Sequence, residues 1–330
     1  MNDLLKAKLG LFAENNQVAK KDFFWQSVLL KRLTALLYAA ENKVIDCDAI
    51  RGRYELIKKS TGVFSTFRGN SAMILVTLLS LSTDKDARFS DTLAVYDLMK
   101  EVKFRASDYL AIAAYQVAAN SKPDHYLQIV TRARAFYDGM KEAHPLLTGQ
   151  NDYIFAAILG LSDIDVGTGL TDMEQLYSAL KPEFLSGNGV QALSHVLVLG
   201  GNPTASIDRL FALRNAFRDR GLRLDRENTI SSLGVLSLLP VDVNEIVGGV
   251  AESYDHLRAQ KGFGKWSVAK QELLLFSTAL FAFEYVDSEK SGILSTTIST
   301  SITNILIAQQ AAVIAAAVSS TAAASAAASG

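Results

Sequence analysis

The stretch YDLMKEVKFRASDYLAIAAYQVAA, residues 96–119, contains the pattern that decides the fold of this chain. Tyr96 and Lys100 are four positions apart, a short polar segment follows, and a strongly apolar run begins at Tyr109. Four positions are about one helical turn, so Tyr96 and Lys100 share one face of a helix. The stretch therefore predicts the end of one helix, a short loop and a second helix. That second helix is apolar nearly all round and should be buried.

Related segments recur along the chain at regular intervals. They are YELIK, YDLMK, YDGMK, YSALK, RNAFR and YDHLR, which begin at residues 54, 96, 137, 177, 214 and 254. Their starts are 42, 41, 40, 37 and 40 residues apart. Apolar runs begin at Met73, Tyr109, Ile154, Ala192 and Leu273, and LTALLYAA at Leu33 opens the series. Each unit thus has a tyrosine helix, which carries the recurring segment, and an apolar helix.

A period near forty residues with two helices in each unit is typical of HEAT-type solenoids. We therefore expect an all-α protein with about six tandem helical hairpins of ~40 residues that form an α/α superhelix. A closed α/α toroid fits the same spacing, but the short loops and the lack of a recurring acidic cluster favour the open form. The expected parts are listed by residue: 1–22, an N-terminal capping helix; 23–286, a single helical-repeat domain; and 287–330, an uncharged Ala/Ser-rich C-terminal helix and tail.

Local sequence signals predict where helices begin and end. Gly62, Gly221 and Gly262 follow tyrosine segments, at positions where a glycine commonly ends a helix in the left-handed conformation. TDME at residues 171–174 and DVNE at residues 242–245 have the pattern of capping boxes, and we expect both to open tyrosine helices.

The composition narrows the classes of protein to which the chain can belong. Hydrophobic residues make up 49% of the 330 residues and charged residues 20%, as in globular rather than disordered proteins. The net charge of −1 does not attract the protein to the negative backbone of a nucleic acid, so no nucleic-acid partner is expected. Cys47 is the single cysteine and no secretory signal opens the chain, so a cytoplasmic location is expected.

The end of the chain is uncharged after Lys290. A transmembrane helix needs about 20 mostly apolar residues. Four polar residues interrupt the apolar run of residues 302–318, namely Thr303, Asn304, Gln309 and Gln310. The favoured interpretation is a helix that covers the last repeat. Membrane association through residues 293–318, or self-association of the tail, is the alternative.

Motifs with known chemistry are absent from the sequence. We find no Walker loop, dinucleotide fingerprint, zinc-protease motif or nucleophile elbow, and the four histidines lack metal-ligand spacing. No catalytic residue, metal or cofactor is therefore predicted. The segment KGFGKWS, residues 261–267, fits binding of an anion or a stacked base, but a glycine cap and an anchoring aromatic residue are the favoured interpretation.

Arg68 in TGVFSTFRGN, residues 61–70, is the best candidate for a binding residue. We expect it in the first turn of an apolar helix, where the positive end of the helix dipole disfavours a cation and calls for an anionic companion. The favoured companion is an Asp or Glu of an adjacent repeat. The alternative is an anionic ligand held by Arg68 with backbone N–H groups near Gly69 and Asn70.

Four of the quoted segments also carry a resemblance to a known family. TGVFSTFRGN followed by MILVTLLSL, with LTALLYA and YDLMK, resembles an uncharacterised bacterial family, domain of unknown function four thousand and three. The resemblance covers most of the chain and is weakest in the tail. It implies a largely helical, cytosolic bacterial protein, and it brings no activity, cofactor or catalytic residue.

Three functions fit these observations. We expect a helical-repeat binding or scaffold protein that engages a protein, peptide or small ligand in its concave face. One alternative is an α/α-toroid enzyme with a central anion-binding pocket. The other is a membrane-peripheral or self-associating protein that uses the C-terminal tail.

Overall fold

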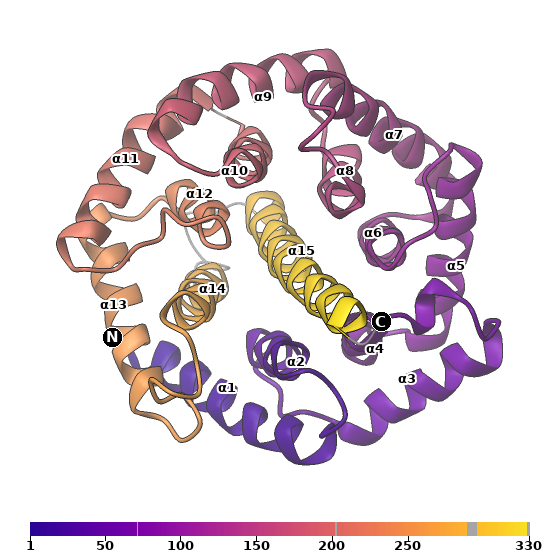
Figure 1. Ribbon diagram of the computed structural model, residues 1–330, viewed down its shortest axis with the longest axis horizontal. Helices are drawn as coiled ribbons and strands as arrows, with labels where there is room; N and C mark the ends of the chain where they lie inside the picture. The colour runs from indigo at the N-terminus through magenta and orange to yellow at the C-terminus, as the bar shows by residue number, and fades with distance from the viewer. Residues whose placement is uncertain (71, 202, 289–295, 329–330) are drawn as a thin grey trace. The chain divides into compact units, whose positions relative to one another are not determined.

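The chain folds into α-helices throughout the part that the structure describes. The computed structural model describes residues 1–70, 72–201, 203–288 and 296–328 (Figure 1). Within these ranges it contains fifteen α-helices, four short 3-10 helices and no strand. The predicted all-α class is confirmed.

The α-helices follow one another in two alternating kinds. The apolar helices are α2 (Val28–Ala40), α4 (Ala72–Leu81), α6 (Asp108–Asn120), α8 (Tyr153–Leu161), α10 (Gly187–Leu199), α12 (Ile230–Leu238) and α14 (Lys270–Ser288). The tyrosine helices are α3 (Cys47–Ser60), α5 (Lys85–Glu101), α7 (Tyr126–Ala143), α9 (Val166–Leu180), α11 (Pro203–Asp219) and α13 (Val243–Ala259). α1 (Asp3–Asp22) precedes them and α15 (Thr296–Ala328) follows. Every recurring segment, from Tyr54 to Tyr254, begins in the second half of a tyrosine helix.

Two compact units make up the chain, and each is described by itself. Unit 1 contains Met1–Gln17, Ala39–Lys43 and Gly167–Ile307. Unit 2 contains Val18–Tyr38, Val44–Val166 and Ala308–Gly330. The parts predicted from the sequence, with boundaries after residues 22 and 286, describe the extent of the repeats and stay a prediction. The choice between an open superhelix and a closed toroid also stays open.

In unit 2, the helices from α5 to α8 pack on their neighbours in sequence and on the equivalent helices of the next pair. α5 contacts α6 and α7 contacts α8, while α6 also contacts α8 and α5 contacts α7. The apolar helices are buried on all sides: every residue of 72–80 and of 153–160 is buried. A tyrosine helix buries one stripe, as Tyr126, Val130, Ala133, Tyr137 and Met140 do on α7. This is the burial that the two hydrophobic patterns predict.

Unit 1 has the same packing, and α1 joins it. α13 contacts α14, α11 contacts α13, and the apolar helices α10, α12 and α14 contact one another in order. Phe12 of α1 is fully buried, with its ring centroid 5.3 Å from Phe263 and 5.4 Å from Phe276. Lys8 is buried as well, and its ammonium group donates to Ala40 O at 3.0 Å and pairs with Asp287 at 2.9 Å. The first helix of the chain is therefore tied to its last hairpin by apolar and ionic contacts.

One arginine contact occurs in both units with the same spacing in sequence. In unit 2, Arg132 of α7 donates to the carbonyl oxygens of Gly160, Ser162 and Ile164, at 3.2, 2.7 and 2.7 Å. In unit 1, Arg209 of α11 donates to the carbonyl oxygens of Ser237, Leu239 and Val241, the first two at 3.0 and 2.6 Å. In both cases the acceptors lie 28, 30 and 32 residues after the arginine. Each arginine satisfies carbonyl groups left free at the end of an apolar helix.

Several predicted helix ends are confirmed and others are wrong. Gly221 and Gly262 have φ angles of 71° and 90° and end their helices in the left-handed conformation, but Gly62 does not. Asp242 caps α13 and accepts from Asn244 N at 2.8 Å. Thr171 caps nothing, because α9 begins at Val166 and the Thr171 hydroxyl donates to Gly167 O at 2.9 Å inside the helix.

One apolar helix was missed in the sequence. α12 has the sequence ISSLGVLSL, whose three serines and one glycine weaken the apolar signal. All residues of 230–237 are nevertheless buried. The small polar side chains fit there because a helical serine can donate to a carbonyl of the preceding turn, as Ser237 does to Gly234 O at 2.7 Å.

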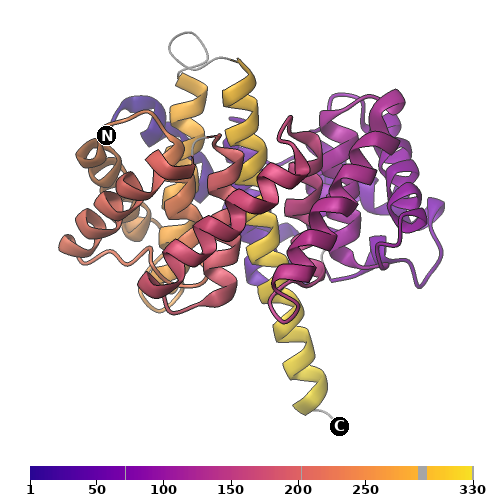
Figure 2. The ribbon, with the colours of Figure 1, turned by 90° about the horizontal axis from the view of Figure 1, so that it is seen from above.

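The C-terminal helix α15 is continuous from Thr296 to Ala328 (Figure 2). Its segment Thr303–Thr321 is, among the described residues, the one helical stretch with the length and hydropathy to cross a membrane. Half of that segment is buried inside the structure, and buried core helices of soluble proteins meet the same criteria, so this is weak evidence. Membrane association through residues 293–318 stays a prediction, and residues 293–295 lie outside the described ranges.

Candidate functional site

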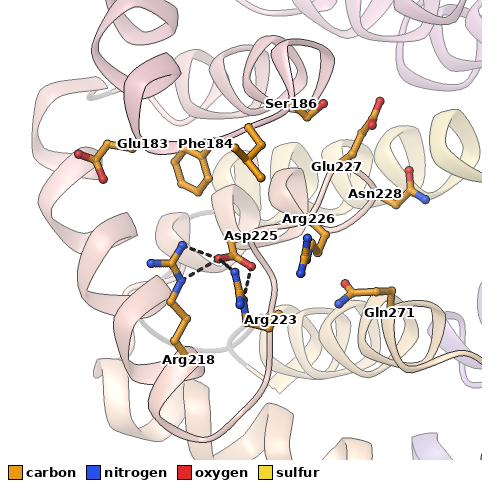
Figure 3. A pocket seen from close by; sticks show the side chains of 11 residues that line it. Glu183, Phe184, Ser186, Arg218, Arg223, Asp225, Arg226, Glu227, Asn228 and Gln271 are labelled. Carbon is orange, nitrogen blue, oxygen red and sulfur yellow. Dashed lines mark hydrogen bonds and ion pairs between the residues drawn. The ribbon is translucent and has the colours of Figure 1, made fainter.

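A pocket of about 620 Å³ lies in unit 1, where loops that precede apolar helices meet (Figure 3). Its walls come from the loop between α9 and α10, the end of α11 with the loop that follows, and the first turn of α14. The lining residues are Glu183, Phe184, Leu185, Ser186, Arg218, Arg223, Asp225, Arg226, Glu227, Asn228 and Gln271. The volume is within the usual range for sites that bind small molecules.

Asp225 organises the loop between α11 and α12. Its side chain is 3% exposed and accepts from Arg218 Nε at 2.7 Å and from Arg223 Nε at 3.0 Å. Burial raises the pKa of the Asp225 carboxyl, but the hydrogen bonds from Arg223 and Arg218 outweigh burial and leave the pKa below its ordinary value. Asp225 is therefore a permanent anion held between two guanidinium groups, as the dashed lines in Figure 3 show.

Arg226 is the pocket arginine whose guanidinium group is free to bind a ligand. Among the described residues its guanidinium group makes no ion pair or hydrogen bond, whereas its backbone carbonyl accepts from Thr229 N and Ile230 N at 2.9 and 2.8 Å. Those two bonds fix the start of α12 and so hold Arg226 in place. In Figure 3 the Arg226 side chain extends between Arg223 and Gln271, and the Glu227 carboxylate points away from it.

Gln271 supplies a second donor. The hydroxyl of Thr229, which is fully buried, lies 3.2 Å from Gln271 Oε1 and 3.3 Å from Arg226 O, and its one hydrogen can be donated to either. When Gln271 Oε1 accepts it, the two N–H groups of Nε2 are left to face the pocket. The Lys270 ammonium group donates to Gly221 O at 2.7 Å and ties the start of α14 to the loop that carries Arg226.

The wall from the loop between α9 and α10 combines two apolar residues, Phe184 and Leu185, with the polar Glu183 and Ser186. Phe184 is 5% exposed and lies under the guanidinium group of Arg214, 5.4 Å from the ring centroid. Arg214 also donates to Glu183 Oε2 at 2.9 Å, so the Glu183 charge is compensated. A Cβ atom on Gly189 would lie 2.9 Å from the Ile230 side chain, so a larger residue there would push α10 away from α12.

The pocket presents donors that suit an anion. The described lining holds no His, Cys or Lys, and its most buried carboxylate has a lowered pKa, whereas a general acid needs a raised one. No group of three or more His, Cys, Asp and Glu side chains in the described ranges is arranged to hold a metal ion. The free Arg226 and the Gln271 amide can instead donate to a carboxylate or a phosphate.

Arg68 lies in a different environment from the one expected. It belongs to the 3-10 helix Thr66–Arg68 before α4, and not to the first turn of α4. Its guanidinium group donates to the carbonyl oxygens of Lys58 and Thr61 at the end of α3, and its Nε donates to the Thr61 hydroxyl at 3.2 Å. The negative end of the α3 dipole therefore stabilises the cation that was expected at a positive end.

The other two residues of the expected anion site are close to Arg68. Gly69 N donates to Thr66 O at 3.1 Å, and a Cβ atom on Gly69 would lie 2.1 Å from Asp108 Oδ1. Asn70 is exposed in the turn that follows. The Asp108 carboxylate thus occupies the space beside Gly69. Anion binding at Arg68, Gly69 and Asn70 stays a prediction.

Sequence reasoning did not single out the pocket residues. The signal available was the density of charge in RDRGLRLDREN, residues 218–228, with four arginines and three acidic residues. This charge density does not by itself indicate a site, because the segment RNAFR, which ends at Arg218, and Gly221 both fit the repeat pattern. Nothing in the sequence pairs these residues with Phe184 or Gln271, more than thirty positions away.

Comparison with known proteins gives a family and no activity. The family model described as Protein of unknown function (DUF4003) matches residues 15–311 and confirms the resemblance found in the sequence. No curated protein and no solved structure is significantly similar to the chain.

Proposed function

For this chain, which belongs to the DUF4003 family of unknown function, we propose a role as a helical-repeat binding protein that holds a small anionic ligand in its unit 1 pocket. The observation that carries the proposal is the Arg226 guanidinium group, which has no partner among the described residues and lies in a pocket of about 620 Å³.

Two observations support the repeat architecture. The recurring segments lie at matching positions of successive tyrosine helices. Arg132 and Arg209 make the same three contacts with carbonyl groups 28, 30 and 32 residues later. In tandem repeats, equivalent residues face equivalent neighbours, so a contact at a fixed offset in both units is expected of repeated hairpins.

The ligand class follows from the charges around the pocket. Asp225 is shared by Arg218 and Arg223, so this cluster of three carries a net positive charge. Glu227, which also lines the pocket, has its carboxylate pointing away from Arg226. The Glu183 charge is compensated by Arg214. A guanidinium group binds carboxylate and phosphate through two parallel N–H groups, and the Gln271 amide adds donors beside it. Leu185, which is 94% exposed, gives the ligand an apolar surface to contact.

The test measures anion-dependent stabilisation of the full chain. We expect small mono- and dicarboxylates or phosphate compounds to raise the melting temperature, since a ligand at 100 times its Kd adds about 2.7 kcal/mol to the free energy of unfolding. Arg226→Gln should abolish this stabilisation without lowering the melting temperature of the free protein, because its guanidinium group makes no ion pair or hydrogen bond with a described residue. The carboxylate and phosphate series distinguish the two anionic groups.

Arg220→Gln is the matched control. Arg220 is exposed in the same charged segment but does not line the pocket, so its replacement removes the same charge from the protein at a different place. The proposal is wrong if both variants weaken the stabilisation equally, or if no anion in either series stabilises the unchanged protein.

A further inference from the structure

Unit 2 exposes large apolar side chains in the loops that follow its tyrosine helices and α1. Phe64 and Leu146 are 102% and 98% exposed, and Phe24, Val63 and Trp25 are 75%, 75% and 55% exposed. All five lie in loops that lead from α1 or from a tyrosine helix into an apolar helix. A single exposed apolar side chain is ordinary on a protein surface, but several that are gathered at one end of a unit mark an interaction site.

Contacts between successive loops place these tips at one end of unit 2. Gln26 donates to the Tyr54 hydroxyl in the last part of α3 at 2.9 Å. Asp108, at the start of α6, lies against Gly69. Arg105 N donates to the Tyr153 hydroxyl at 3.3 Å and so connects the next two loops. We call residues 20–28, 58–70, 100–108 and 141–153 the basic end of unit 2.

The two ends of unit 2 carry opposite charge. The basic end has nine Lys and Arg residues and five Asp and Glu residues. The loops at the opposite end, residues 44–48, 82–88, 120–126 and 162–166, have three Lys and Arg residues and seven Asp and Glu residues. Apolar loop residues are concentrated at the positive end, since Val44 and Leu127 are the exposed large apolar residues that lie elsewhere in the described part of unit 2.

Lysines lie three to six positions before the apolar loop residues in sequence. Lys20 and Lys21 come before Phe24 and Trp25, and Lys58 and Lys59 come before Val63 and Phe64, all four lysines being exposed. Among the described residues, Lys21 and Lys59 form no ion pair. Lys141 likewise precedes Leu146.

The same combination recurs in unit 1, taken by itself. Lys181 precedes Leu185, which is 94% exposed, and Lys265 precedes Trp266, which is 103% exposed. Trp266 is therefore not the anchoring aromatic expected in KGFGKWS, and the fully buried Phe263 has that place. Recurrence in loops of the same type shows that the combination belongs to the repeat pattern and not to one loop.

We propose that the basic end of unit 2 docks on an anionic lipid surface, with the side chains of Trp25, Phe64 and Leu146 inserted among the lipid headgroups. Lysines near a membrane are attracted by anionic lipid, and exposed aromatic and aliphatic side chains enter the headgroup region. The acidic loops lie at the other end of the unit, so the proposed orientation brings only the positive end to the negative surface.

A lipid surface fits these side chains better than a protein partner. Protein interfaces bury their aromatic anchors in complementary pockets and are depleted of lysine. Here the apolar side chains stand on separate loop tips, and lysines accompany them. Separate tips surrounded by cations are suited to a surface that is fluid and uniformly negative.

The chain contains two tryptophans, Trp25 and Trp266, which makes a local test possible. In the full-length Trp266→Phe variant, all tryptophan emission comes from the basic end of unit 2. We expect vesicles of 70% phosphatidylcholine and 30% phosphatidylglycerol to shift that emission to shorter wavelength, and pure phosphatidylcholine vesicles to leave it unchanged. Binding without a shift would show that another segment, such as α15, touches the membrane, and would overturn the proposal.

Matched variants separate the basic end from general effects of charge and hydrophobicity. Phe64→Ser with Leu146→Ser should weaken vesicle binding about tenfold or more, because each removes an inserted side chain. Lys21→Gln with Lys59→Gln should weaken it by about the same factor. Val44→Ser with Leu127→Ser and the single change Lys122→Gln alter exposed residues elsewhere on unit 2 and should leave binding within twofold. Equal losses in the two sets, or no binding to anionic vesicles, would contradict the proposal.

Discussion

Asp152 gives the sharpest test of the structure, because its carboxyl group is buried without an ionic partner in direct contact. It ends the 3-10 helix Gln150–Asp152 before α8 and is 5% exposed. Its Oδ2 accepts from Gly149 N at 2.8 Å. Burial raises the pKa of Asp152 from 3.8 to about 6, although the Gly149 hydrogen bond and the nearby Lys141 act in the opposite direction. We predict that Asp152→Asn stabilises the protein at neutral pH.

The sign and size follow from the two pKa values. Well below pH 3.8 the carboxyl group is neutral in both the folded and the unfolded chain, so Asp and Asn should be nearly equivalent. Between pH 4 and pH 6 the unfolded chain loses the proton that the folded chain keeps, and the free energy of unfolding falls as pH rises. Above pH 6 the loss is complete and amounts to about 3 kcal/mol, at about 1.4 kcal/mol for each pKa unit.

The assay is thermal unfolding of the unchanged protein and of Asp152→Asn between pH 4 and pH 8. At about 2.1 cal/mol/K of unfolding entropy per residue, the expected gain for this chain is about 4 °C above pH 6.5. The difference should shrink toward zero at pH 4. The asparagine can still accept from Gly149 N, so the hydrogen bond is kept.

Glu142→Gln is the control, because Glu142 is exposed in the last turn of α7, ten residues before Asp152, and its replacement removes the same charge. It should leave the melting temperature unchanged within about 1 °C, as expected for surface substitutions. A pH-independent difference between Asp152→Asn and the unchanged protein, or a loss of stability at pH 7.5, would refute the reasoning.

Two further predictions concern packing. Arg209→Met removes three charge-assisted bonds to carbonyl groups and should lower the free energy of unfolding in urea by about 2 kcal/mol, whereas Arg220→Met, at an exposed position, should change it by less than about 0.5 kcal/mol. Similar losses in both would contradict the contact. Gly160→Ala should destabilise by about 1–3 kcal/mol, because its Cβ would lie 2.7 Å from Ile129 O. Gly248→Ala, with no atom within 4 Å, should instead stabilise α13 by about 0.5–1 kcal/mol, and circular dichroism melting curves would show both effects. A destabilised Gly248→Ala would indicate contacts that the structure lacks.

The helices could be predicted because their signals are local. The tyrosine segments and the apolar runs indicated nearly every helix, and α4 is buried on all sides as its run of apolar residues predicts. α12 was missed because a serine satisfied by its own helix is as buried as a leucine but scores as polar. The Thr171 cap was wrong because the same four residues that open a helix also occur inside one.

The candidate site could not be predicted, because its parts are joined only by packing between helices. Arg68 was chosen for its unusual neighbours in sequence, yet its partners are carbonyl groups at the end of α3. Arg226 has ordinary neighbours in sequence and became a candidate only because Asp225 binds Arg218 and Arg223 and leaves it free. Which of several arginines is paired depends on distances that sequence does not contain.

By itself, the sequence determined the all-α class, the alternation of tyrosine and apolar helices and the membership of a family, because side chains three and four positions apart meet on one helix face whatever surrounds them. The tertiary structure alone decided that Phe184, Arg226 and Gln271 line one pocket and that Trp25, Phe64 and Leu146 stay exposed. Those outcomes depend on how α10, α12 and α14 pack in unit 1 and on how successive loops meet in unit 2. Contacts between residues some forty or more positions apart are set by the fit of whole helices against one another.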